Sequence, residues 1–189
     1  MRPFGTFVVV GWAAFLAGCG EGQFYDEIEA RACPEATPLG GESAPRSNAV
    51  VLSLRSFDCQ LGSLVIEVQA VDVEPGVTMA YLELVDVPDL LVVRSVAGGS
   101  FPAQGTAPFF SSGRPVVEAP GNFLLVHGGL QPSAERGGAV FVIDFDLIRT
   151  PFRDEVVELG VEPATSALFG ADYRPLEGVA FVGTRIRFR

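Results

Sequence analysis

The sequence predicts an all-β protein, folded as a single antiparallel sandwich of two sheets, and three observations support this fold class. Short segments rich in Val, Leu, Ile and Phe recur from about residue 48 to the end of the chain, separated by turn residues. Several segments alternate apolar and polar residues, and none keeps a helical period. About 140 residues suffice for one hydrophobic core and are too few for two domains.

The first 18 residues have the layout of a secretory signal. Arg2 precedes an apolar run from Phe4 to Leu16, and the small residues Ala17 and Gly18 follow. The run is shorter than the roughly 20 apolar residues that a membrane-spanning helix needs. We therefore expect export and cleavage, and the alternative is a signal that stays in the membrane as an anchor.

The motif Leu-Ala-Gly-Cys at residues 16–19 resembles the lipobox of bacterial lipoproteins. In that family the cysteine sulfur receives a diacylglycerol, the chain is cut before it, and the new amino group is acylated. The resemblance makes Cys19 the lipidated first residue of the mature protein. Because Gly20 and not Asp follows it, the pattern favours the outer membrane. The alternative is a chance cysteine at the end of an ordinary signal.

Three cysteines are an odd number for an exported chain, and lipidation of Cys19 would leave two. In an oxidising compartment Cys33 and Cys59 are expected to form a disulfide. The bridge would close a loop of about 27 residues and contribute about 3 kcal/mol in the chain-entropy model. The alternative is two separate buried thiols. Residues 19–46, rich in Glu, Pro, Gly and Ala, are predicted to be a flexible tether to a domain at 47–189.

Eight segments are predicted to be strands, and eight or nine such strands make a two-sheet sandwich. The connections carry turn chemistry, as in Glu-Pro-Gly, Val-Pro-Asp and Ala-Pro-Gly-Asn. In chain order the segments cover residues 50–57, 61–73, 77–87, 90–96, 122–128, 138–148, 155–161 and 178–189.

Alternation in two of these segments predicts which side chains face outward. In 138–148, Asp144 and Asp146 lie opposite the apolar face formed by Phe141, Ile143, Phe145 and Leu147. In 178–189, Arg185 and Arg187 lie opposite the face formed by Ala180, Val182, Ile186 and Phe188. These two acidic and two basic residues are the candidate partner-binding face. The alternatives are a solvated carboxylate face and arginines that pair with carboxylates on neighbouring strands.

Residues 98–120 form a long connection rich in Gly, Pro and Ser. Connections of this length are uncommon and are often functional. The alternative is a strand pair that the pattern does not reveal, with Phe109 and Phe110 buried.

The charge and the residue inventory exclude several functions. With 23 acidic residues against 13 basic ones, the net charge is -10, and such a field repels nucleic acid. The one histidine, His127, ends a strand and has no triad partners in the sequence, so no catalytic residue, metal ligand or cofactor is predicted. Trp12 lies in the signal and Tyr81 is expected to pack, which disfavours a glycan-binding platform.

Residues 48–189 resemble cohesin modules, which share a superfamily with some carbohydrate-binding modules. The likeness is carried mainly by MAYLELVDVPDLLVVRSVAGGSF at 79–101, with Asp89 and Leu90 in the turn and a valine-rich strand that ends at Gly98. The segments at 137–148 and 178–188 resemble later cohesin strands.

The resemblance implies a jelly-roll of nine strands that binds a protein partner through one sheet face. In cohesins that partner is a dockerin, a small calcium-loaded module. The predicted function is therefore a non-catalytic interaction module, held at the cell envelope by lipid. The alternatives are a carbohydrate-binding module of the same superfamily and a purely structural envelope lipoprotein.

Overall fold

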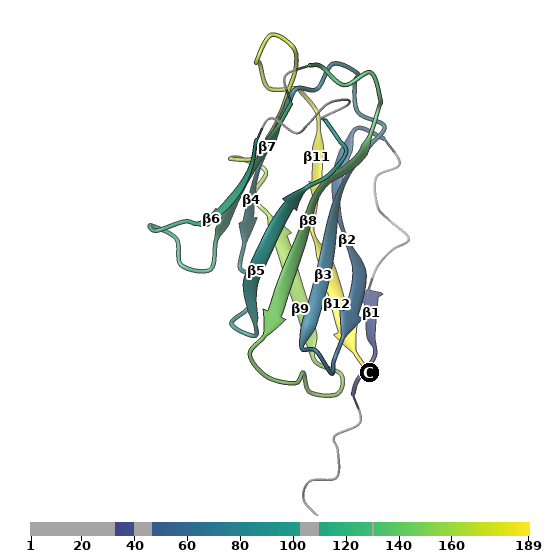
Figure 1. Ribbon diagram of the computed structural model, residues 1–189, viewed down its shortest axis with the longest axis vertical. Coiled ribbons are helices and arrows are strands. Elements are labelled where there is room, and N and C mark those ends of the chain that lie inside the picture. Colours follow the sequence, from purple (N-terminus) through teal and green to yellow (C-terminus); the bar gives the residue numbers. More distant parts are fainter. Residues whose placement is uncertain (1–32, 40–46, 103–109, 130) are drawn as a thin grey trace, which may run out of the picture. The chain divides into compact units, whose positions relative to one another are not determined.

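The computed structural model describes residues 33–39, 47–102, 110–129 and 131–189 (Figure 1). Contacts divide the chain into residues 1–32 and the compact unit Cys33–Arg189, which holds all of the described residues. The predicted signal, Cys19 and the tether as far as residue 32 lie outside the described residues and stay predictions. In the part of the chain that is described, no helix could cross a membrane.

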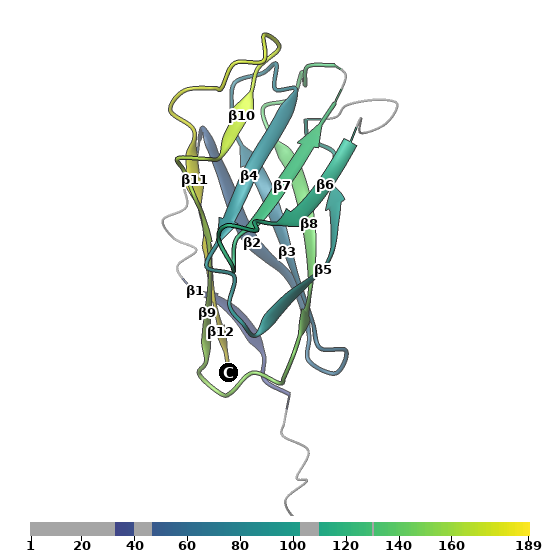
Figure 2. The same ribbon diagram turned by 90° about the vertical axis from the view of Figure 1, so that its left-hand side faces the viewer.

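The described residues form two β-sheets packed face to face, which confirms the predicted sandwich (Figures 1 and 2). The seven-stranded sheet has the order β1-β12-β9-β4-β7-β6, and β10 pairs with β4. Its strands are β1 (Ala36–Leu39), β4 (Met79–Val85), β6 (Phe110–Pro115), β7 (Phe123–Gly128), β9 (Val156–Val161), β10 (Ala167–Phe169) and β12 (Thr184–Phe188). The five-stranded sheet has the order β11-β2-β3-β8-β5. Its strands are β2 (Ala49–Asp58), β3 (Ser63–Val71), β5 (Leu91–Gly98), β8 (Gly138–Leu147) and β11 (Ala180–Val182).

The hydrophobic core lies between the sheets and comes from alternate residues of the strands. On β8, Phe141, Ile143 and Phe145 are fully buried, as the alternation predicts. Leu64 and Ile66 lie beside them on β3 of the same sheet, and Leu82 and Leu84 on β4 come from the opposite sheet. Burying one such side chain contributes about 1.5–3 kcal/mol, so this shared layer is what holds the two sheets together.

The end of the predicted tether belongs to the sandwich instead. Residues 36–39 form β1, which pairs antiparallel with β12, the last strand, from Ala36 opposite Phe188 to Leu39 opposite Arg185. Arg189 and Glu35 exchange two backbone hydrogen bonds of 2.8 Å just before it. Pro38 disfavours the prediction of a strand from the sequence. An edge strand such as β1 tolerates proline, because it forms ladder hydrogen bonds on one side only.

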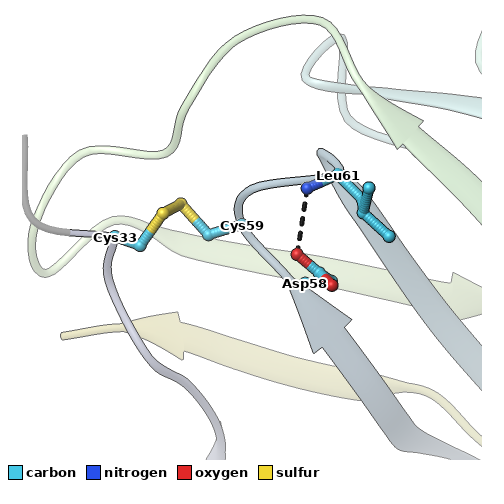
Figure 3. Close-up of a disulfide and its surroundings, with 4 residues drawn as sticks. All are labelled: Cys33, Asp58, Cys59 and Leu61. Carbon is cyan, nitrogen blue, oxygen red and sulfur yellow. Dashed lines mark hydrogen bonds between the residues drawn. A yellow bond between two sulfur atoms is a disulfide. The ribbon is translucent and has the colours of Figure 1, made fainter.

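The predicted disulfide between Cys33 and Cys59 is confirmed (Figure 3). Its Cα atoms lie 5.6 Å apart, and the bridge joins the chain just before β1 to the end of β2. Because β1 belongs to the seven-stranded sheet and β2 to the five-stranded sheet, the bridge links the two sheets covalently.

The segment predicted as one last strand is split at Gly183. Residues 180–182 form β11, which pairs parallel with β2, while β12 pairs with β9 in the other sheet. A Cβ atom on Gly183 would lie 2.3 Å from the carbonyl oxygen of Leu159, so only glycine fits where the chain changes sheets. Ala180 and Val182 therefore do not share a face with Ile186.

The long connection contains a strand, in agreement with the alternative drawn from its sequence. Residues 110–115 form β6, which pairs antiparallel with β7 from Phe110 opposite Gly128 to Pro115 opposite Phe123. A Cβ atom on Gly113 would lie 2.6 Å from the ring of Phe123, and the missing side chain lets the hairpin pack closely. The predicted burial of Phe109 and Phe110 concerns side chains outside those that the structure describes.

Candidate protein-interaction surface

The two predicted acidic residues lie on the outer face of the five-stranded sheet, on β8. Asp144 and Asp146 alternate with the buried Ile143 and Phe145, so their side chains point away from the core. Ser63 on β3 donates a hydrogen bond of 3.0 Å from its hydroxyl to Oδ1 of Asp144. The neighbouring strand thus already satisfies part of this carboxylate.

Arg94 on β5 holds both carboxylates from the other side. Its Nε donates to Oδ1 of Asp146 at 2.7 Å, and Nη1 lies 3.3 Å from Oδ2 of Asp144. Hydrogen bonding by the guanidinium lowers the pKa of Asp146 below its ordinary value and raises the pKa of Arg94. One guanidinium thus offsets one of the two carboxylate charges, and both carboxylates already have hydrogen-bond donors within the sheet.

The two predicted basic residues lie on the seven-stranded sheet, on β12. Nε of Arg185 lies 3.3 Å from Oε2 of Glu158 on β9, as the internal-pairing alternative predicts. Arg187 stands between Thr37 on β1 and Val156 on β9, and its Nε is buried. Since the two outer faces of a sandwich point in opposite directions, Asp144, Asp146, Arg185 and Arg187 do not form one continuous face.

A different surface on the seven-stranded sheet is more apolar. On β4 the buried Ala80, Leu82 and Leu84 alternate with half-buried residues that point outward. The outward positions of β7 and β10 continue this surface, because Tyr81 pairs with Val126 and Met79 pairs with Phe169. We call these residues the apolar sheet face: Met79, Tyr81, Leu124, Val126 and Phe169.

None of these five residues is among the partly buried side chains that pack against the described core. Their partial burial comes from their neighbours on the same face of the sheet, as in the cross-strand pair of Tyr81 and Val126. Tyr81 is half-buried as packing would predict, but it lies on the outer face of the sheet and not among the residues that pack against the core. The signal that could have found this face is the run Met-Ala-Tyr-Leu-Glu-Leu-Val, in which both alternating sets are largely apolar.

Glu83 is the next outward-pointing residue after Tyr81 on β4 and lies at the border of the apolar sheet face. Its carboxylate accepts hydrogen bonds of 2.7 Å from Nδ2 of Asn122 and from the hydroxyl of Thr165. These two bonds, that of Thr165 first, lower the pKa of Glu83. Ser166 accepts a hydrogen bond from the Glu83 backbone N–H at 3.0 Å, so the β9–β10 connection is fastened to this border.

His127 lies at the end of β7, as predicted, but it is fully buried inside the sandwich, so the alternative of a surface histidine is wrong. Its ring packs edge-on against Phe141, with centroids 5.7 Å apart. A Cβ atom on Gly98 would lie 2.4 Å from the ring, so that glycine makes room for it. A histidine enclosed in this way cannot reach a substrate. Among the described residues, no three His, Cys, Asp or Glu side chains are placed to hold a metal ion.

Two open grooves lie at the margins of the sandwich. One, of about 580 Å³, runs beside the disulfide along residues 33–36 and 54–60. The other, of about 370 Å³, is lined by residues 87–89, residues 91–93, Pro115 and residues 121–123. The described lining contains carboxylates, Glu35 and Asp58 in the first groove and Asp89 in the second, and no histidine in either.

No protein-family model and no curated protein matches this chain. Solved structures do match it. One is the sixth cohesin of scaffoldin B from Acetivibrio cellulolyticus, solved in complex with a Cel5 dockerin mutant. The TM-score is 0.55 at 15% identity, over 73% of this chain and 95% of that chain.

A type I cohesin–dockerin complex from Clostridium thermocellum gives a TM-score of 0.52 at 14% identity, over 72% of this chain and 96% of that one. The solution structure of CaCohA2 from Clostridium acetobutylicum gives 0.54 at 15% identity, over 74% and 88%. At these identities the likeness concerns the fold, and the described sandwich is a cohesin-like β-sandwich.

Proposed function

We propose that this protein is a non-catalytic interaction module that binds a protein partner of the dockerin type through the apolar sheet face. The observation that carries the proposal is an apolar outer surface on a cohesin-like sandwich. Solvated sheet faces are usually polar, and clustered apolar side chains on a surface mark binding sites.

The composition of the apolar sheet face fits a protein partner. Interface centres are rich in aromatic residues and Met and poor in charge, and this face offers Tyr81, Phe169 and Met79. Tyr81 lies at its middle, with Val126 on one side and Ala167 of β10 on the other. Large aromatic side chains at such central positions often dominate the binding energy.

We further propose that the module works at the cell envelope, attached through lipid on Cys19 and placed at the outer membrane. The support is the sequence of residues 1–19 together with the Cys33–Cys59 disulfide, which forms in oxidising compartments. Two or more acyl chains hold a protein stably on a membrane, whereas one does so only marginally.

Affinity capture tests the interaction. The bait is the chain from Gly20 onward, folded under oxidising conditions, against envelope and secreted proteins of its own host, with and without a calcium chelator. Each captured protein is identified, purified and titrated against the bait. We expect one partner that binds directly and, if it is of the dockerin type, only in the presence of calcium.

A matched pair of substitutions locates the binding face. Val126→Arg and Val142→Arg each place a cation at a half-buried outward position in the middle of a sheet, on opposite faces. We expect Val126→Arg to weaken binding roughly 100-fold, since losing a central contact costs about 2 kcal/mol or more. Val142→Arg should bind as the parent does. Equal losses in both, or an empty bait, would contradict the proposal.

A further inference from the structure

Three large apolar side chains stand exposed at the loop tips of one end of the sandwich. Leu61 is 74% exposed, Ile148 66% and Phe152 56%. Single exposed apolar residues are common on protein surfaces, but a group at one end marks an interaction site.

The loops hold these side chains outward. In the β2–β3 turn, Oδ1 of Asp58 accepts a hydrogen bond of 2.9 Å from the Leu61 N–H (Figure 3). The Ile148 N–H donates to the carbonyl of Leu90 at 3.0 Å. The Phe152 N–H donates to Oε2 of Glu155 at 2.7 Å. The exposure is thus a property of ordered turns.

Further contacts place the three tips at the same end. The Leu147 N–H donates to the carbonyl of Gly62 at 2.8 Å, which joins the β2–β3 turn to the β8–β9 loop. The Asp154 N–H donates to the carbonyl of Phe188, next to the C-terminal residue, at 2.6 Å. Figures 1 and 2 show both loops beside the C-terminus, at the lower end of the sandwich.

The chain enters the described unit at this end as well. Cys33 is its first residue, and the disulfide fastens it to Cys59 in the same β2–β3 turn. Cys19, the predicted lipid attachment site, lies 14 residues earlier in the sequence. Fourteen residues reach about 50 Å when fully extended and about 20 Å as a flexible coil. A lipid on Cys19 therefore confines this end to the neighbourhood of the bilayer.

We propose that this end rests on the lipid bilayer, with the side chains of Leu61, Ile148 and Phe152 in its interface. The inference depends on the lipid anchor under the proposed function and adds a defined orientation to it. The sandwich then stands on its loop tips, and the apolar sheet face points sideways, where a partner can reach it.

The charges at this end fit an apolar contact better than an electrostatic one. Arg149 pairs with Glu155 at 2.6 Å, and its guanidinium lies 4.5 Å from the centre of the Phe152 ring. Arg153 and Arg189 are matched in number by Asp58 and Asp154, which lie in the two loops at this end. With no net basic patch, the end suits zwitterionic headgroups, and the apolar tips supply the attraction.

Single tryptophans test this orientation. The one tryptophan of the chain, Trp12, lies in the predicted signal, so the mature protein offers no competing emission. The variants are Leu61→Trp, Ile148→Trp and Phe152→Trp. The control is Tyr173→Trp, a 72% exposed position in the β10–β11 connection, and Figure 2 shows this connection at the other end of the sandwich. Each lipidated full chain is reconstituted into phosphatidylcholine–phosphatidylethanolamine vesicles with and without brominated acyl chains.

We expect blue-shifted emission that the brominated chains quench for the three tip variants, and water-like unquenched emission for Tyr173→Trp. Unquenched emission from all four would overturn the proposal. A blue shift that grows with protein concentration without vesicles would also overturn it, because the tips would then contact a second copy.

The anchor is checked separately by acyl labelling of Cys19 and by flotation with the vesicles. A chain that floats without quenching leaves the anchor in place and contradicts the orientation. If Cys19 is not acylated, the same variants are attached by an N-terminal His-tag at residue 20 to nickel-chelating lipids. Quenching in that arrangement supports the tip contact without the lipid anchor, and its absence contradicts it.

Discussion

The two outer faces of this sandwich differ in chemistry, because one carries paired charges and the other carries apolar side chains. On the five-stranded sheet, Arg94 pairs with both Asp144 and Asp146, so the carboxylates already have a cationic partner. On the seven-stranded sheet, β4 and β7 present Tyr81 and Val126 side by side, and neither packs against the described core. Charged residues that are evident in the sequence, such as Asp144 and Asp146, therefore do not locate a binding site when they already have partners within the sheet.

Paired surface charges add little to association, because a partner would have to break existing contacts before making new ones. An outward apolar cluster gains free energy from any complementary surface that removes it from water. This contrast supports the proposal that a partner binds the apolar sheet face and not the outer face of the five-stranded sheet.

The largest expected effect is a difference in the free energy of unfolding between variants of two adjacent residues on β4. Leu82 is fully buried in the core, whereas Tyr81 faces outward. We expect Leu82→Ala to lower the free energy of unfolding by about 2–5 kcal/mol, through lost burial and a cavity. Tyr81→Ala should cost about 1 kcal/mol or less, as typical surface changes do. Denaturant titration of both variants measures the difference.

Partner binding should show the reverse order, with Tyr81→Ala affected and Leu82→Ala largely intact where it remains folded. If Tyr81→Ala destabilises the protein as much as Leu82→Ala does, the residue belongs to the core. The apolar sheet face would then be part of the fold, and the contrast between the two faces would collapse.

Alternation within single strands made much of this fold predictable. On β8, Phe141 and Asp144 read from the sequence as facing opposite ways, and they do. The disulfide could be predicted because the lipobox resemblance sets Cys19 aside, which leaves Cys33 and Cys59 as the one possible pair. What such patterns report is which side of a strand is buried, one strand at a time.

Features that depend on two distant segments were not predictable in this way. Gly183 allows the last segment to change sheets, but its need for glycine arises from the backbone of Leu159, 24 positions earlier in the chain. Residues 36–39 become a strand only because β12 offers a free edge. The run around Tyr81 shows that both alternating sets of β4 are largely apolar, but not which of the two faces the core.

A smaller effect on stability is expected on the outer face of the five-stranded sheet, where Arg94 pairs with Asp146. Removing the guanidinium in Arg94→Ala should raise the pKa of Asp146 toward its ordinary value, which a carboxylate NMR titration measures. A carboxylate whose pKa is lowered by folding adds stability above its unfolded pKa and loses it as the pH falls through the folded pKa. The variant should thus be slightly less stable than the parent at neutral pH and equally stable in strong acid. An unchanged pKa of Asp146 would show that Arg94 does not hold it in solution.

The smallest expected effect is a difference in how salt changes the pKa of one carboxylate on each outer face. The pKa values of Asp146 and Glu83 are both lowered, but a cation holds Asp146 whereas the neutral groups of Thr165 and Asn122 hold Glu83. Raising the ionic strength from about 0.1 M to 1 M shortens the screening length from about 10 Å to 3 Å. We expect the pKa of Asp146 to rise with salt and that of Glu83 to stay low, because neutral donors are not screened. Equal pKa shifts for both carboxylates would mean that one long-range electrostatic field acts on both. The pKa of Glu83, at the border of the apolar sheet face, would then depend on salt as that of Asp146 does.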